Sequence, residues 1–371
     1  MSSVASGSER IHLGMDTSKN TIVVGVLRPG EEVPVVDRVF NDEASVRRLI
    51  GRFPDRSVLA ACYEAGPGGY ELHRLLTSMN VACDVVAPSL IPKGYGDRVK
   101  TDRRDAIRLA RLHRAGELTA IRVPTPAEEA VRDLIRVRRD LLGDRKRVQQ
   151  RIGALLLRHG RIWRNGATWT KAHREWVAVQ TFTEPALNAA LAAYQGALSA
   201  REVELAALEA QLHTLAGLEP LATAVGRLSC YRGIAELSAL TLVAEVVDWR
   251  RFATARAFMG FTGLTPTEYS SGERTRRGGI TKAGPESVRT VLVEAAWSYR
   301  NKPTIGSGLR TRQNNASPPT IARSWTAQQR LCGRYRRMLA TGKSPAITIV
   351  AIARELAGFT WAEMTAEPLT A

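Results

Sequence analysis

The first hundred residues carry short apolar stretches separated by turn residues. The pattern predicts five strands, at residues 11–16, 21–27, 33–40, 57–64 and 81–87. Apolar residues at helical spacing predict helices at residues 41–53 and 69–79, and a third helix that begins near residue 102. Three consecutive strands followed by alternating helices and strands predict an α/β fold, with a mixed sheet covered by helices.

From about residue 126 the apolar spacing becomes that of a long amphipathic helix, and the same spacing returns between residues 185 and 218. Two long helices in succession predict either an antiparallel helical hairpin or an intermolecular coiled coil. Three tryptophans lie between them, Trp163, Trp169 and Trp176. Such residues either stack on nucleic-acid bases or close the end of a helical hairpin.

The chain is strongly basic, with a formal net charge of +17 and a pI near 10.4. Eleven Lys or Arg stand against three Asp between Arg132 and Arg164, and eleven more lie between Glu294 and Glu355 with no acidic residue among them. This imbalance favours a nucleic acid over a membrane as the partner, although a solvated basic face is the alternative. The predicted nucleic-acid contacts are Lys100, Arg138, Arg145, Arg147, Arg151, Arg274, Arg276, Arg277, Lys282, Arg334, Arg336 and Arg337.

Other sequence features limit the class of protein. The four cysteines are far apart and form no cluster with histidine, so the sequence predicts neither a zinc site nor a disulfide framework. No apolar run has the length of a signal peptide or of a membrane span. We therefore expect a soluble protein in a reducing cytosol, without a membrane partner.

Four acidic residues are candidates for metal-assisted chemistry. Asp102 and Asp105 stand three residues apart at the start of a predicted helix, where they share one face. On its own this spacing is more typical of a helix N-terminus. Asp16 and Glu64, however, each end a predicted strand, and strand ends are where an α/β sheet presents its chemistry. Four carboxylates suit Mg²⁺ or Mn²⁺, and a two-metal site would support phosphoryl transfer.

Two glycine-rich stretches offer further candidate sites. Residues 65–70 are either a phosphate-binding turn before a helix or an ordinary tight turn. Residues 263–284 predict a polar, glycine-punctuated loop dense in guanidinium groups, which are able to grip phosphates. Within it Ser271 stands beside Gly272. A serine without a histidine partner is usually a turn residue, so chemistry alone does not make it a nucleophile.

These stretches carry motifs that follow one another in a fixed order. The motifs are Gly-Met-Asp-Thr-Ser-Lys at 14–19, Glu-Ala-Gly-Pro-Gly-Gly-Tyr at 64–70, Lys-Thr-Asp-Arg-Arg-Asp-Ala at 100–106, and Gly-Leu-Thr-Pro, Tyr-Ser-Ser-Gly and Thr-Lys-Ala-Gly within 263–284. In combination they resemble the DEDD transposases of the IS110 insertion-sequence family. The resemblance runs from about Ile11 to Trp361.

The resemblance implies three domains. Residues 1–124 would form a RuvC-like, ribonuclease-H-type DEDD catalytic domain, residues 125–218 a coiled-coil oligomerisation segment, and residues 219–371 a mainly α transposase domain. The metal ligands implied by the family are Asp16, Glu64, Asp102 and Asp105, and the implied nucleophile is Ser271, the serine directly before the glycine.

The resemblance also implies partners and a mechanism. Family members are DNA recombinases guided by a structured non-coding RNA, the bridge RNA, and form a covalent phosphoserine intermediate. The implied partners are donor and target DNA, the bridge RNA, and further copies of the chain that assemble from dimers into a tetramer with composite sites.

One departure and two rival functions accompany this interpretation. The family's Pro-Gly-Ile-Gly motif is replaced by Arg232-Gly233-Ile234-Ala235, which puts a backbone grip on DNA there in doubt. The main alternative is a RuvC-like junction nuclease that uses metal-activated water and does not need Ser271. A third hypothesis is a basic scaffold protein that binds RNA or DNA and catalyses no reaction.

Overall fold

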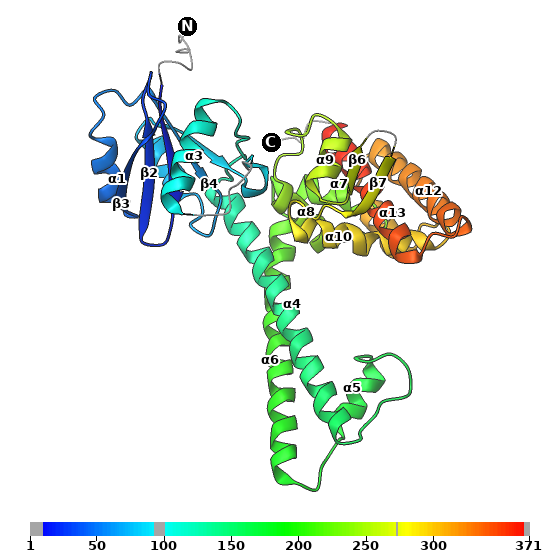
Figure 1. Cartoon of the computed structure of the whole chain (residues 1–371). Coiled ribbons are helices and arrows are strands. Elements are labelled where there is room, and N and C mark those ends of the chain that lie inside the picture. The colour runs from blue at the N-terminus through cyan, green and yellow to red at the C-terminus, as the bar shows by residue number, and fades with distance from the viewer. Residues whose placement is uncertain (1–9, 93–100, 272–273, 367–371) are drawn as a thin grey trace. The chain divides into compact units, whose positions relative to one another are not determined.

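The computed structural model describes residues 10–92, 101–271 and 274–366 of the chain (Figure 1). It divides into two compact units, residues 1–123 and 124–371. The predicted division into three domains stays a prediction, but these two units are the bodies into which the chain packs.

The first unit is built on a five-stranded sheet with the order β3-β2-β1-β4-β5. Its strands are β1 (Ile11–Thr17), β2 (Thr21–Leu27), β3 (Val35–Phe40), β4 (Leu59–Glu64) and β5 (Ala82–Val86). The first three strands pair antiparallel, whereas β4 pairs parallel to both β1 and β5. The predicted mixed sheet is confirmed, and it is consistent with a ribonuclease-H-like fold.

Helices cover both faces of this sheet, and alternate residues of β1 contact the helices on each face. They are α1 (Glu43–Ile50), α2 (Glu71–Ser78), the short η1 (Pro88–Leu90) and α3 (Asp102–Arg114). Leu13 and Met15 of β1 share a buried apolar cluster with residues of α1 and α2. Gly14 lies between them on the other face, against α3. Successive strand residues point to opposite faces, so β1 divides the unit into an α1–α2 side and an α3 side.

Two glycines allow α3 to approach the sheet closely. A Cβ atom on Gly14 would collide with the backbone of Ala106 and Ala110, and one on Gly25 would collide with Ala106. The helix begins where Thr101 accepts a hydrogen bond from the backbone N–H of Arg104, 3.3 Å away. The cap and the glycines together fix where α3 starts and how near it lies to β1 and β2.

The second unit begins with a helical hairpin. Two long antiparallel helices, α4 (Pro126–Arg158) and α6 (Pro185–Ala216), pack along each other, with the shorter α5 (Lys171–Ala178) near the turn (Figure 1). A capping box between Thr125 and Glu128 starts α4. Trp169 and Trp176 pack against the apolar cluster between the helices. This agrees with the expectation that the tryptophans close the end of a hairpin.

The rest of the unit is mainly helical around one large core. Its helices are α7 (Leu221–Ser229), α8 (Glu236–Val246), α9 (Ala255–Phe261), α10 (Glu286–Ala296), η2 (Trp297–Arg300), α11 (Ser307–Gln313), α12 (Pro318–Ala340) and α13 (Pro345–Ala366). Ile135 of α4 and Leu212 of α6 belong to the same buried cluster as Leu240 and Leu356. One end of the helical hairpin is therefore part of the C-terminal core.

A buried carboxylate ties this core together. Glu363 of α13 is fully buried and accepts hydrogen bonds from Arg227, Arg323, Thr320 and the hydroxyl of Tyr231. The Nε atoms of Arg227 and Arg323 lie 3.0 and 2.6 Å from its oxygens. Burial by itself raises the pKa of Glu363, but its hydrogen bonds from Arg323, Thr320 and Arg227 bring that pKa below its ordinary value.

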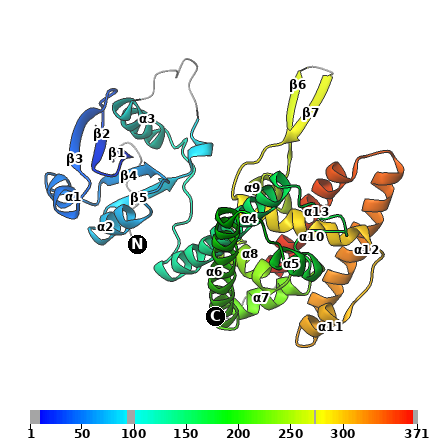
Figure 2. The same cartoon turned by 90° about the horizontal axis from the view of Figure 1, so that it is seen from below.

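The predicted loop at residues 263–284 is wrong in part. The structure has a β-hairpin there, formed by β6 (Pro266–Ser271) and β7 (Arg274–Ile280), which extends away from the helices (Figure 2). Strand prediction relies on alternating apolar and polar residues, and this stretch is polar on consecutive positions. Backbone pairing therefore formed a sheet that the side-chain pattern did not indicate.

Glycines close the base of this hairpin. Gly263 and Gly284 both have positive φ angles, near +67° and +70°. A Cβ on Gly263 would collide with the backbone of Ala283, and one on Gly284 with the backbone of Phe261. The motif glycines thus let the two ends of the hairpin meet directly after α9.

The turn between α7 and α8 holds the departure from the family motif. Gly233 has φ near +85° and packs so closely on α10 that a Cβ would collide with Ala295. Arg232 donates hydrogen bonds to the carbonyl of Lys302 and to Oε1 of Gln328, at 2.8 and 3.0 Å. At this position Arg232 is therefore bonded to the protein itself.

Candidate active site

Contacts between α3 and β1 fix the direction in which the helix crosses the sheet. The Nδ1 atoms of His12 and His113 lie 3.3 Å apart, near the end of the helix. Two residues further along β1, Gly14 packs against Ala106 and Ala110. A strand advances about 6.6 Å in two residues and a helix about 6 Å in four. The next residue on this face, Asp16, therefore lies toward the first turn of α3.

The neighbouring strand shows the same alignment. The Sγ atom of Cys62 in β4 lies 3.6 Å from the carbonyl oxygen of Leu109, so Cys62 faces α3. Cys62 is the register partner of Gly14. Glu64 follows it by two residues and is on the same face, at the end of β4.

All four predicted acids therefore belong to one side and one end of the first unit. Asp16 and Glu64 come from the ends of two paired parallel strands, while Asp102 and Asp105 occupy the first turn of the helix that covers them. Asp16, Glu64 and Asp105 are partly buried and Asp102 is exposed. Four carboxylates so placed are a donor set suited to a hard divalent cation.

The side chains do not converge into a finished metal site. Among the residues that the structure describes, no group of three or more His, Cys, Asp or Glu side chains is arranged to hold a metal ion. The carboxylate of Asp102 lies 3.8 Å from a guanidinium nitrogen of Arg38. The backbone thus brings the acids to one end of the sheet, while their carboxylates do not form a metal-holding group among the described residues.

A second polar cluster lies at the other end of α3, and no sequence pattern indicates it. His113 contacts His12 and also lies 3.2 Å from the carboxylate of Asp84 in β5. The hydrogen bond from His113 lowers the pKa of Asp84. These residues come from distant parts of the chain, so only their contact reveals them. They fasten the C-terminal end of α3 to the sheet.

Ser271 ends β6, opposite Arg274 of β7 in the strand register. The register also sets Tyr269 opposite Arg276, and Glu268 opposite Arg277. The predicted nucleophile and three predicted phosphate contacts thus belong to one two-stranded ribbon. Lys282, just beyond its base, is exposed and has φ near +55°.

The basic residues of α4 fall into different surroundings. Arg138 is bound to Glu209 of α6, at 2.6 Å, and Arg147 pairs with Asp144. The Nε atom of Arg145 is buried with no hydrogen-bond partner in the described part of the chain. Arg151 is exposed and has no ion pair with any described residue. Acidic residues of the helical hairpin therefore neutralise some of the arginines that the sequence predicted to bind phosphate.

The other predicted contacts lie on α12, with one exception. Arg336 and Arg337 are exposed and line a groove of about 650 Å³ together with Arg330. Arg334 is paired with Glu355 of α13, at 3.0 Å. Lys100 lies outside the described residues.

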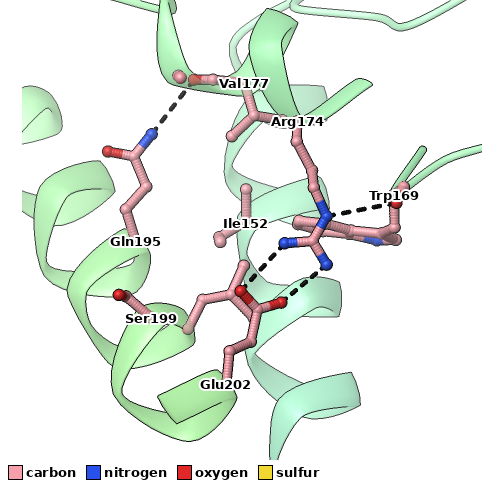
Figure 3. Close-up of a pocket in the computed structure, with 9 residues that line it drawn as sticks. Ile152, Trp169, Arg174, Val177, Gln195, Ser199 and Glu202 are labelled. Carbon is pink, nitrogen blue, oxygen red and sulfur yellow. Dashed lines mark hydrogen bonds and ion pairs between the residues drawn. The ribbon is translucent and has the colours of Figure 1, made fainter. Parts of the chain in front are cut away.

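A small pocket of about 250 Å³ lies where α5 packs against α4 and α6 (Figure 3). Its polar groups bind one another. Arg174 pairs with both oxygens of Glu202, at 2.7 and 3.1 Å, and Gln195 donates to the carbonyl of Val177, as Figure 3 shows. These bonds join α5 to α6, and we assign the pocket a structural role.

None of the helices in the described residues is long and apolar enough to cross a membrane.

Comparisons with known proteins match both units. Residues 13–160 match a family model of DEDD transposases of the IS110 type, and residues 225–307 match the model described as "Transposase IS116/IS110/IS902 family". A protein of Sinorhizobium fredii named "Putative transposase y4qE" is 43% identical over 94% of this chain and 87% of its own length. The transposase for insertion sequence element IS1533 of Leptospira borgpetersenii is 30% identical over 89% of this chain and 96% of its own. The chain therefore belongs to the IS110 family of DEDD insertion-sequence transposases, enzymes that act on DNA and generally depend on a divalent metal ion.

Proposed function

We propose that this transposase is an RNA-guided recombinase that cuts and rejoins donor and target DNA through a covalent phosphoserine at Ser271. The observation that carries the proposal is the gathering of Asp16, Glu64, Asp102 and Asp105 at one end of the sheet beneath α3. The position of Ser271 at the end of an extended ribbon supports its role as the group that reaches DNA.

The proposed step is an exchange of one phosphate ester for another. The hydroxyl oxygen of Ser271 attacks the phosphorus of a DNA phosphodiester, and the bond from phosphorus to the leaving DNA oxygen breaks. The serine loses its proton and the departing DNA oxygen gains one, so the products are a phosphoserine and a free strand end. Attack by the end of another strand reverses the step and joins the two DNA molecules.

The acids and the arginines would assist this exchange in different ways. Asp16, Glu64, Asp102 and Asp105 would hold Mg²⁺ or Mn²⁺, which when bound neutralises charge that develops on the transferring phosphate. Arg274, Arg276 and Arg277, on the strand that pairs with the serine strand, would bind phosphates of the attacked DNA strand by charge-assisted hydrogen bonds. We propose that acids and serine from different protomers of a tetramer act on one phosphate.

The guide RNA would supply the sequence specificity. Base pairing reads a DNA sequence without protein contacts to the bases, so the protein needs to hold mainly backbones. The exposed arginines Arg151, Arg336 and Arg337 are available for that purpose. A chain with a net charge of +17 is suited to two nucleic acids at once.

Denaturing gel electrophoresis tests the proposal. The protein is incubated with the RNA encoded by its element, labelled donor and target DNA, and Mg²⁺. We expect a labelled protein–DNA adduct with the wild type and with Ser270→Ala, and none with Ser271→Ala. Ser270 is the matched control because it is the neighbouring serine in the same strand. Omission of the RNA should abolish the adduct with every variant.

The gel also tests the rival functions. Cleavage that persists in Ser271→Ala without an adduct would establish a junction nuclease that uses water. Binding without cleavage by any variant, at any metal concentration, would identify a scaffold.

A further inference from the structure

A cavity of about 450 Å³ lies at the foot of the β6–β7 hairpin. The first residues of β6 form one wall, and α9, α12 and α13 form the others. It is lined by Arg256, Met259, Thr265, Pro266, Glu268, Arg330, Arg334, Arg354 and Glu355. We call it the arginine pocket, after Arg256, Arg330, Arg334 and Arg354.

The arginine pocket has more positive charge than its own acids neutralise. Four guanidinium groups line it against two carboxylates. Glu355 binds both Arg330 and Arg334, so one acid already serves two arginines. Arg256 and Arg354 have no ion pair with any described residue.

One donor of the pocket is also left unused by the protein. The Nε atom of Arg334 is buried and has no hydrogen-bond partner among the residues described. A buried donor without a partner destabilises the folded protein, and more so when the group is charged. The protein therefore leaves the Arg334 guanidinium incompletely satisfied, and an anion in the pocket would pair with Arg256 and Arg354, which have no ion pair among the described residues.

We infer that the arginine pocket binds a backbone phosphate of the DNA strand that Ser271 attacks, a few nucleotides from the cut. This inference rests on the proposed function only for the identity of the attacked strand. Arginine presents planar forked donors that match phosphate oxygens, and arginines from three helices would surround one phosphate. The pocket then anchors the DNA at the base of the hairpin while Ser271, at the end of β6, reaches the scissile bond.

The length of β6 predicts which phosphate is held. Glu268 and Pro266, which line the pocket, precede Ser271 by three and five residues. A strand rises about 3.3 Å per residue, so the pocket lies about 10–17 Å from the serine along the hairpin. One strand of DNA advances about 3.4 Å per nucleotide. The bound phosphate is therefore about three to five nucleotides from the cut.

The hairpin also favours DNA over the guide RNA as the ligand. A pocket built partly from β6 is joined to Ser271 by a few residues of the same strand. A phosphate bound there fixes the attacked strand directly, which a contact to RNA elsewhere in the complex would not do.

A scan with methylphosphonates tests the inference. Single uncharged methylphosphonates are placed at each position of the target or donor strand, and the affinity for the protein–RNA complex is measured. The Ser271→Ala protein is used throughout, so that no chemistry is required. We expect one position, three to five nucleotides from the mapped junction, to weaken binding about tenfold, as loss of one charge-assisted hydrogen bond does.

The variants Arg354→Gln and Arg256→Gln identify the partner of that phosphate. Each should weaken binding to ordinary DNA and remove most of the further loss caused by the methylphosphonate at this one position. Arg48→Gln is the matched control, since Arg48 is exposed on α1, a helix on the other side of the sheet from the acids. The control should keep the full tenfold effect, and thermal unfolding should show that all three variants are folded.

The inference would be overturned if the losses of affinity from the arginine variants and from the methylphosphonates were additive at every DNA position. It would also be overturned if the arginine variants were coupled only to methylphosphonates placed in the RNA. Failure of the proposed function is recognised separately. If the gel shows no adduct but the coupling is present, the pocket holds DNA and the serine chemistry is wrong.

Discussion

The acid cluster and the serine hairpin reach their places by different physical means. Asp16 and Glu64 end buried strands, and α3 is fixed over them by Gly14, Gly25 and the Thr101 cap. The serine strand pairs with β7, and close contacts at Gly263 and Gly284 hold the base of this ribbon. The proposed metal ligands are thus positioned by packing on a core, and the proposed nucleophile by backbone pairing in a two-stranded ribbon.

This difference has a functional consequence. A carboxylate set must hold its geometry to bind a cation, and burial on a sheet provides that rigidity. A nucleophile that must reach a long double helix benefits from extension beyond the protein surface. We therefore expect substitutions near the acids to lower the cleavage rate by displacing the carboxylates. Substitutions near the hairpin should lower it by displacing Ser271 from the DNA or by removing contacts to the DNA.

The largest effect is expected from removal of one metal ligand. Asp102→Asn should lower the rate of DNA cleavage about 10³-fold or more, because it removes a charged ligand from the acid cluster. Binding to the RNA and DNA should remain, and cleavage is followed on denaturing gels.

The matched control is Glu43→Gln, which removes an exposed carboxylate paired with Arg47 on α1. It should leave the rate within twofold. Equal losses in the two variants would mean that general charge, and no specific ligand set, is responsible.

The next effect concerns the core that supports the hairpin. Glu363 lies on α13, which packs against α9, the helix directly before β6. Glu363→Gln leaves buried Arg227 and partly buried Arg323 without their counter-charge and should lower the free energy of unfolding by about 3–5 kcal/mol. Urea denaturation at neutral pH measures this loss.

Acid should remove the same stabilisation from the wild type. The pKa of Glu363 is lowered in the folded state, so the unfolded chain binds more protons as the pH falls through that range. The contribution is complete above the unfolded pKa of about 4.5 and is lost as the pH falls through the lower folded pKa. The difference in free energy of unfolding between wild type and Glu363→Gln should therefore decrease as the pH falls below about 5. A difference that stays constant down to pH 3 would contradict stabilisation by the ionised carboxylate of Glu363.

A smaller effect tests the approach of α3 to the sheet. Gly14→Ala places a methyl group against the backbone of Ala106 and Ala110 and should cost about 1–3 kcal/mol of unfolding free energy. Because the helix must shift with its two acids, cleavage should fall as well. Gly68→Ala is the control in the same unit, since a Cβ there meets nothing within 4 Å, and should change stability by less than about 0.5 kcal/mol. Similar stabilities for the two variants would show that α3 is not held by this contact.

The smallest effect compares two arginines of α4. Arg151→Gln should reduce the slope of log affinity against log salt by about 1, because an exposed arginine without an internal partner is free to bind a phosphate. Arg138→Gln should change the slope by less, because Glu209 already neutralises that charge. Filter binding from low to moderate salt measures both, and equal changes would show that Glu209 releases Arg138 on binding.

The sequence indicated a large part of this architecture. Apolar alternation found the five strands of the sheet, and helical spacing found α3, α4 and α6. It failed at the β6–β7 hairpin, because both strands are polar on successive positions and only backbone pairing makes them a sheet. It also missed the cluster of His12, Asp84 and His113, which comes together only when β1, β5 and α3 pack.

Some residues of the candidate sites could likewise be predicted from the sequence, and others could not. Spacing and strand ends identified Asp16, Glu64, Asp102 and Asp105, because acids at strand ends and on one helical turn are visible locally. Arg256 and Arg354 gave no such signal, since nothing in the sequence brings α9 and α13 to the foot of the hairpin. Likewise, the partners of Arg138 and Arg334 were hidden, because Glu209 and Glu355 belong to other helices.

The sequence by itself determined the choice of the four candidate acids, the candidate serine before its glycine, the net positive charge and the family. Each of these depends on residue type and on spacing within a short stretch, which the local geometry of strands and helices translates directly. Tertiary structure alone decided that the acids share one end of a sheet, which arginines keep free charge, and that the serine ends a ribbon. Those facts depend on contacts between distant segments, and their energies are set by packing that no single stretch contains.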